Sequence, residues 1–209
     1  MHGFVPEVFL ASKGSEWSVD EQQQILTGIA HPVSDIYIDP SCNQPDSAAA
    51  PRHDAATLMT SAPVGDFQLS STVTVYFKET FDAGVLLLRA SEQVWAKLCF
   101  EYSPDGEAMV VSVVNKGKTS DDANAFVVAG SRVDLRISRK ENVYSFHAAV
   151  ESNRWIFIRA FSFDESAHET TGSMTLGFMA QSPNGSGCKV EFGNISLTNT
   201  TLAQLRDGN

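Results

Sequence analysis

From Phe67 onward, apolar and polar residues alternate in short bursts separated by Gly, Pro, Asn and Asp residues. This period of two is typical of half-buried antiparallel strands, and helical spacing is nearly absent. We therefore predict an all-β fold, a two-sheet antiparallel jelly-roll sandwich. The pattern places strands at residues 68–78, 84–90, 94–102, 108–115, 133–138, 143–151, 155–163, 174–181 and 189–198.

The segments between these strands indicate how they connect. Ser103-Pro104-Asp105-Gly106 has the chemistry of a tight reversal, so the flanking strands 94–102 and 108–115 should form a hairpin. Polar turns join the next three strands and predict a meander. Residues 30–62 are rich in Pro, Asp, Ser and Ala, and we expect one long loop that binds something or is disordered. Residues 200–209 are expected to form a frayed tail or a short helix.

The composition bounds the domain count and the partners. The chain has 209 residues, 43% of them hydrophobic, which is enough for a core, and we expect residues 1–209 to form one domain. A net charge of −10 without a cluster of Lys and Arg repels phosphate groups. We therefore expect no nucleic acid and no anionic membrane surface as partners.

Three widely spaced cysteines, Cys42, Cys99 and Cys188, contain no Cys-x-x-Cys pair. They predict neither a disulfide framework nor a zinc cluster, and a reducing compartment fits them best. The start has no basic segment followed by an apolar run, and no stretch approaches about 20 apolar residues. We therefore expect a cytoplasmic protein.

Known chemical motifs are absent from the sequence. It contains no Gly-x-Ser-x-Gly elbow, Walker loop, dinucleotide glycine pattern or His-Glu-x-x-His zinc motif, so we expect no cofactor and no metal. Sandwiches of this kind sometimes hold calcium at a loop through carboxylates. Asp121 and Asp122 are the best candidates for such ligands.

Several segments together resemble a known family. The segment Phe81-Asp82-Ala83-Gly84 resembles its Asp-x-Ala-Gly motif, although Asp82 directly precedes Ala83 here, and after a hydrophobic strand Trp95, Lys97 and Glu101 fit its Trp-x-Lys-x-x-x-Glu motif. Three further motifs agree in order and spacing: Ser34-Asp35-Ile36-Tyr37, Ser112-Val113-Val114-Asn115-Lys116-Gly117 and Trp155-Ile156-Phe157-Ile158-Arg159. Over roughly its whole length the chain thus resembles the family of domains of unknown function typified by YesU.

The resemblance implies a concanavalin A-like sandwich, but it implies no reaction, because the family's activity is not established. Some members are labelled as regulators of enolase, which implies a protein partner. Members usually have Ser-Asp-Trp a few residues after the Gly that corresponds to Gly117. This chain has Thr119-Ser120-Asp121-Asp122 there, without the Trp, so that aromatic contact is not carried over.

Residues two apart in a strand share a face, so Trp95, Lys97, Cys99 and Glu101 project to one side of their strand. Mixed aromatic and charged faces suit sugars, whose C–H groups stack on rings and whose hydroxyl groups bind carboxylates and guanidinium groups. The alternative is a solvated face with a weak ion pair between Lys97 and Glu101. We predict a concave binding face lined by Trp95, Lys97, Glu101, Asn115, Arg136 and Arg159.

Asp35 and Tyr37 lie where the predicted long loop begins. If this loop folds over the face, they supply an acceptor and a stacking ring. Alternatively, Asp35 only fixes a turn through its own backbone bonds. His147 is expected to be structural, as a lone His in a strand usually is.

Three functions remain open at this point. The first is a non-catalytic carbohydrate-binding module, in which Glu101 and Arg159 bind hydroxyl groups while Tyr37 or Trp95 stacks on the sugar. The second is an enzyme that acts on a glycan, with Glu101 as acid or base and Asp35 as its partner. No strand carries the paired acids of a retaining glycosidase, which weighs against hydrolysis. The third is a regulatory scaffold that binds a protein through a sheet edge or residues 30–62.

Overall fold

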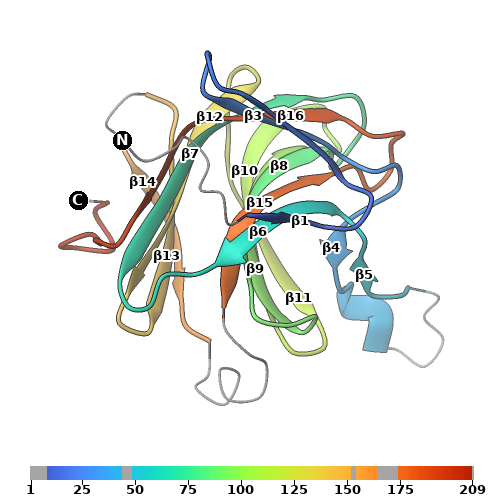
Figure 1. Cartoon of the computed structure of the whole chain (residues 1–209). Coiled ribbons are helices and arrows are strands. Elements are labelled where there is room, and N and C mark those ends of the chain that lie inside the picture. The colour runs from blue at the N-terminus through green and yellow to red at the C-terminus, as the bar shows by residue number, and fades with distance from the viewer. Residues whose placement is uncertain (1–8, 44–48, 152–153, 164–173, 209) are drawn as a thin grey trace.

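The computed structural model describes residues 9–43, 49–151, 154–163 and 174–208, which form two seven-stranded antiparallel sheets that face each other (Figure 1). The all-β sandwich is confirmed. The first sheet has the order β1 (Leu10–Ala11), β6 (Ala56–Ser61), β15 (Thr175–Gln181), β8 (Ala83–Arg89), β9 (Val94–Tyr102), β10 (Ala108–Lys116) and β11 (Ser120–Val127). The second sheet has the order β14 (Ile156–Phe161), β13 (Val143–Ala149), β12 (Arg132–Lys140), β7 (Phe67–Tyr76), β16 (Lys189–Thr198), β3 (Ile25–Ile29) and β2 (Glu16–Asp20).

The core lies between the sheets and follows from the period of two. On β9, Ala96, Leu98 and Phe100 are fully buried in one cluster with inward residues of the second sheet. Their neighbours along the strand face the opposite side of the first sheet. Removing this apolar surface from water is the dominant favourable term for such a fold.

Several predicted connections are confirmed. Strands β9 and β10 form the predicted hairpin, with Tyr102 opposite Ala108 and a positive φ at Gly106. Strands β12, β13 and β14 are sequential neighbours, as the predicted meander requires. The described residues include no helix that is long and apolar enough to cross a membrane.

The prediction of one long loop over residues 30–62 is wrong. Strand β6 lies within this range and pairs with β1 and β15. Strands β2, β3 and β11 were also not predicted. Strand β11 is an edge strand with mostly exposed side chains, so its sequence has no apolar alternation that would mark it.

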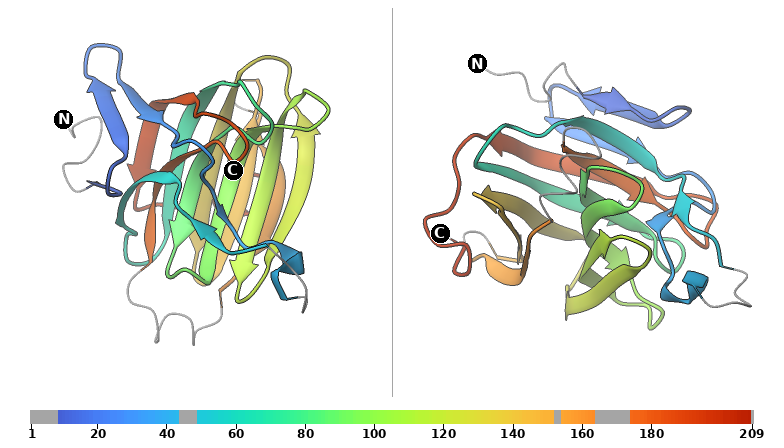
Figure 2. Two further views of the ribbon diagram at one scale, coloured as in Figure 1. Left: turned by 90° about the vertical axis from the view of Figure 1, so that its right-hand side faces the viewer. Right: turned by 90° about the horizontal axis from the view of Figure 1, so that it is seen from below.

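Residues 34–43 and 49–55 fold onto the outer face of the first sheet, and we call them the covering segment. They contain β4 (Ile36–Tyr37), η1 (Pro40–Asn43) and β5 (Arg52–His53), which lie on the side away from the second sheet (Figures 1 and 2). Apolar side chains of the covering segment and of the outer face beneath it therefore form a second, smaller cluster. It contains Ile36, Ile38, Ala55, Ala83, Val85, Leu87, Trp95, Cys99, Val111, Val113 and Met179.

Residues 200–208 lie against the second sheet as an irregular segment, so the prediction of a frayed tail or a short helix is wrong for them. Leu202 is buried, and the carbonyl group of Ala203 accepts a hydrogen bond from Lys140 at 2.8 Å. The carbonyl group of Gly208 accepts one from Arg136 at 2.7 Å. Asn209 lies outside the described residues.

Candidate functional site

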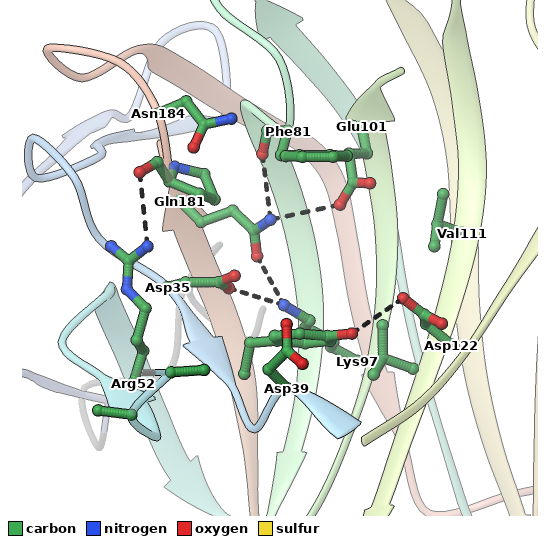
Figure 3. Close-up of a pocket in the computed structure, with 15 residues that line it drawn as sticks. Asp35, Asp39, Arg52, Phe81, Lys97, Glu101, Val111, Asp122, Gln181 and Asn184 are labelled. Carbon is green, nitrogen blue, oxygen red and sulfur yellow. Dashed lines mark hydrogen bonds and ion pairs between the residues drawn. The ribbon is translucent and has the colours of Figure 1, made fainter. Parts of the chain in front are cut away.

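A pocket of about 460 Å³ opens on the outer face of the first sheet, against the covering segment. This size lies in the range of pockets that hold small ligands. Figure 3 shows the side chains that point into it. Its polar lining includes Asp35, Tyr37, Lys97, Glu101, Asp122 and Gln181.

The strand register explains why two of these side chains meet. Gln181 of β15, Ala83 of β8 and Glu101 of β9 are successive partners across three neighbouring strands. Residues opposite each other on one face lie close enough to interact. Because the methyl group of Ala83 is small, the longer side chains on either side can reach each other above it.

Lys97 lies at the centre of the polar network and is only 2% exposed. Its Nζ donates hydrogen bonds to Asp35 Oδ1 at 2.7 Å and to Gln181 Oε1 at 3.0 Å. The ring centroids of Tyr37 and Trp95 lie 5.7 and 5.9 Å from the same nitrogen. These oxygen atoms and aromatic faces replace the water that the ammonium group loses on burial.

The charge state of Lys97 follows from this environment. Burial lowers the pKa of Lys97, but the facing carboxylates, with Asp35 the strongest, outweigh burial and leave the pKa raised. Lys97 is therefore an ammonium group at neutral pH, a hydrogen-bond donor rather than a nucleophile. The expected alternative, a weak Lys97–Glu101 pair on a solvated face, is wrong because Lys97 pairs with Asp35 beneath the covering segment.

Glu101 faces the pocket at the other end of the network. Its Oε2 accepts a hydrogen bond from Gln181 Nε2 at 3.3 Å, and the same nitrogen donates to the carbonyl group of Phe81 at 3.1 Å. Burial raises the pKa of Glu101 to about 7; Lys97 opposes this rise and the neighbouring carboxylates add to it. Glu101 therefore changes its charge near neutral pH, unlike an ordinary surface carboxylate.

Asp35 is held by the backbone as well as by Lys97. Its Oδ1 accepts a hydrogen bond from the amide of Ile36 at 2.7 Å. Its carbonyl group accepts hydrogen bonds from the amides of Asp54 at 3.0 Å and Ala55 at 3.3 Å. Asp35 thus fixes a turn and also faces the pocket, two roles that the sequence presented as alternatives.

Tyr37 and Asp122 lie together on the β11 side of the pocket. The Tyr37 hydroxyl group donates to Asp122 Oδ2 at 3.3 Å. Burial first, and then the Asp122 carboxylate, raise the pKa of Tyr37, so the phenol stays a donor. Asp122 pairs in register with Val113, which pairs with Lys97 on the other side.

Asp121 and Asp122, the calcium candidates, do not act together. Successive strand residues point to opposite faces. Asp121 pairs with Arg159 at 3.0 Å, whereas Asp122 faces the pocket. Within the described part of the chain, no group of three His, Cys, Asp or Glu residues could hold a metal ion.

Phe81 lies at the pocket rim and is 36% exposed, with a φ of 70° that is unusual for an aromatic residue. Asp82 fixes this turn. Its Oδ2 accepts hydrogen bonds from the amides of Lys78 and Glu79 at 2.9 and 3.0 Å, and its Oδ1 accepts one from Ser182 Oγ at 2.6 Å. Strained residues held this firmly are concentrated at binding sites.

Two predicted ligand-binding residues have structural contacts instead. Trp95 is fully buried, and its Nε1 donates to the carbonyl group of Glu92 at 3.1 Å, so it presents no surface to a ligand. Asn115 is also fully buried. Its Nδ2 donates to the carbonyl groups of Gln93 at 2.7 Å and Gly117 at 2.9 Å, which fixes the turn after β10.

Arg136 and Arg159 lie on the second sheet, so the prediction that they share the face of Glu101 is wrong. The guanidinium group of Arg136 stacks 4.1 Å from the ring centroid of Trp155 on β12's outer side. Arg159 on β14 pairs with Asp121 and joins the edges of the two sheets. The period of two assigns a residue to a face of its strand, but it does not show which strands share a sheet.

His147 also lies on the second sheet, away from the pocket. Its ring packs edge-on against the ring of Phe157, with the two ring centroids 5.7 Å apart. Burial first, and then the charge of Arg136, lower the pKa of His147 to about 4, so it is neutral at pH 7.

Sequence reasoning gave no site role to several pocket residues, among them Asp39, Arg52, Phe81 and Gln181. Phe81 directly precedes the Asp82-Ala83-Gly84 segment of the family resemblance, and this position was the only sequence signal for it. Gln181 ends a buried strand, and only the pairing of β15 with β8 brings it to the site. Asp39 and Arg52 belong to the covering segment, whose fold the sequence pattern did not predict.

A family model described as "Protein of unknown function (DUF1349)" matches residues 11–200. This chain belongs to the DUF1349 family. The match confirms the resemblance to a family of domains of unknown function. No curated protein matches this DUF1349 chain.

Solved structures show that the DUF1349 chain has a concanavalin A-like fold. A functionally unknown protein from Saccharomyces cerevisiae matches with a TM-score of 0.72 and 22% identity, over 93% of this chain and 97% of that chain. The GH43 protein BlXynB from Bacillus licheniformis matches with a TM-score of 0.67 and 14% identity, over 88% of this chain and 35% of that chain. A bifunctional GH43-CE protein from Bacteroides eggerthii matches with a TM-score of 0.71 and 13% identity, over 95% of this chain and 24% of that chain. The DUF1349 chain therefore spans about a third or less of these two longer chains.

The buried ion pair leads to a stability prediction for the DUF1349 protein. Lys97→Met leaves the Asp35 carboxylate buried without its partner, which should lower the free energy of unfolding by about 3–5 kcal/mol. Adding Asp35→Asn removes that charge and keeps an oxygen atom for the Ile36 amide. The double variant should therefore be more stable than Lys97→Met alone, as urea unfolding at pH 7 can measure. If the double variant loses as much free energy of unfolding as Lys97→Met or more, the ion pair between Lys97 and Asp35 does not stabilise the site.

Proposed function

We propose that this protein binds a saccharide in the pocket on the outer face of the first sheet and catalyses no reaction. The observation that carries the proposal is the pocket lining, in which carboxylate, amide and guanidinium groups lie next to an exposed aromatic ring. A saccharide matches such a lining, because it offers C–H faces for stacking and hydroxyl groups for hydrogen bonds.

Each group has a role in this proposal. Glu101 and Asp122 accept hydrogen bonds from sugar hydroxyl groups. The ring of Phe81 supplies the apolar surface for stacking, in place of Trp95, which is buried. Gln181 and Lys97 hold Glu101 and Asp35 in position through the network of hydrogen bonds. A rigid site of this kind loses little conformational entropy when a ligand binds.

The structural neighbours support a sugar-binding role. Longer chains with the same fold carry the GH43 label, which one of them explains as a glycoside hydrolase. The sandwich occupies only a minor part of each. A module that accompanies enzymes of this class fits carbohydrate binding better than a further catalytic role.

A glycan array combined with thermal-shift measurements tests the proposal, because a ligand that binds the native state raises Tm. Glu101→Ala should abolish binding, since it removes the carboxylate acceptor. Its Tm without ligand should not fall, because Glu101 is a desolvated carboxylate. Glu107→Ala removes an exposed carboxylate at the end of the hairpin turn and is the matched control, with unchanged binding. Full binding by Glu101→Ala would contradict the proposal, and a screen without any sugar hit would favour a protein partner.

One observation favours an enzyme as the second candidate. A carboxyl group with a pKa of about 7 can give up a proton at neutral pH, as the general acid of a glycosidase does. Asp35, the expected partner of Glu101, is bound to Lys97 instead. The enzyme candidate therefore has a general acid, Glu101, but Asp35 does not act as the partner that the sequence indicated.

The enzyme candidate predicts a specific pH profile on nitrophenyl glycosides. If Glu101 is the general acid, activity falls as the pH rises through about 7, because the proton is then lost. Glu101→Gln, which has no acidic proton, should be inactive, and Glu107→Gln should match the unmodified protein. Activity that survives in Glu101→Gln would eliminate this mechanism.

A further inference from the structure

The charges that line the pocket determine which charge on a ligand is favoured, given the proposed saccharide-binding function. Four carboxylates line the pocket, those of Asp35, Asp39, Glu101 and Asp122, against two cations. A positive charge on the ligand should therefore favour binding, and a negative charge should oppose it.

Both cations already have partners in the protein. Lys97 Nζ lies 2.7 Å from Asp35 Oδ1 and is buried. The guanidinium group of Arg52 donates to the carbonyl groups of Val33 and Pro183. Lys97 and Arg52 thus already have oxygen acceptors in the protein, and an acidic ligand would have to compete with them for these cations.

The carboxylates of Glu101 and Asp39 differ in the hydrogen bonds that they accept. Asp39 Oδ1 accepts a hydrogen bond from the amide of Ser41 at 2.7 Å, and the hydrogen bonds from Ser41 lower the pKa of Asp39, which keeps it ionised. Glu101 accepts its hydrogen bond from the neutral amide of Gln181 at 3.3 Å. It is desolvated but has no ion-pair partner among the described residues.

The neighbourhood of Glu101 suits an ammonium group. Gln181 Nε2 fills the position between Glu101 Oε2 and the carbonyl oxygen of Phe81, and Glu101 Oε1 accepts no hydrogen bond from the described residues (Figure 3). An ammonium group has three donors for such oxygen atoms, and an aromatic ring nearby adds a favourable cation–π contribution. A desolvated carboxylate gains more from such a partner than a solvated one does.

We propose that the pocket selects a sugar that carries a free amino group, whose ammonium form pairs with Glu101, and rejects sugars that carry a carboxylate. The sugar ring stacks on Phe81, and its hydroxyl groups contact Asp122. Loss of the charge at Glu101 removes the preference for the amine while the other contacts to the sugar remain.

Calorimetric titration of the full chain at pH 7.5 tests this proposal with three sugars: D-glucosamine, D-glucose and D-glucuronate, with the galacto and manno series measured in parallel. We expect the amino sugar to bind at least about ten-fold more tightly than the neutral sugar, equivalent to about 1.4 kcal/mol, and the uronate to bind weakest. Glu101→Gln keeps the shape of the side chain but not its charge, and it should bind glucosamine and glucose equally. Glu107→Gln is the matched control and should keep the preference.

The outcomes separate this inference from the proposed function. Equal affinity for glucosamine and glucose, or tighter binding of glucuronate, would overturn the inference and leave sugar binding intact. A preference that persists in a folded Glu101→Gln variant would also overturn it, because the ammonium group would then pair elsewhere. Absence of binding by every sugar would overturn the proposed function and the inference together. Circular dichroism and Tm establish that each variant is folded.

Discussion

The site depends on the buried ion pair between Lys97 and Asp35. Lys97 comes from a central strand of the first sheet and Asp35 from the covering segment, so their 2.7 Å contact joins the two. Burying two charges costs several kcal/mol per ion and is tolerated only where good geometry and further hydrogen bonds offset it. Gln181 and the Ile36 amide provide those bonds. The pair therefore fixes one wall of the pocket against the sheet that forms its floor.

The sandwich itself is a scaffold, and the site is what distinguishes this chain. The same fold occurs in a yeast protein of unknown function and within much longer GH43 chains, at low identity. A fold shared so widely does not define an activity. The particular features here are the small Ala83 between Gln181 and Glu101, and the strained Phe81 at the rim. Together they place a desolvated carboxylate beside an exposed aromatic ring.

The alternation of residues predicted much of the fold and part of the site. It placed β9 and β16 at their observed bounds, because their side chains alternate between the core and the other face. It also placed Lys97 and Glu101 on one face. It could not separate the two sheets, so Arg136 and Arg159 were assigned to the wrong face. Strand β11 was missed because an edge strand with exposed residues has no apolar signal, and Gln181 because its role depends on a long-range pairing.

The most direct test of this account is an NMR titration of the side-chain carboxyl carbon of Glu101, without ligand and with saturating D-glucosamine. The account predicts a pKa of about 7 in the free protein, because burial disfavours the charged form. It predicts a lower pKa with the amino sugar bound, because an ammonium partner favours the carboxylate. A pKa near the ordinary value of 4.5 that does not respond to the sugar would contradict the claim that Glu101 is a desolvated carboxylate that receives a cationic ligand.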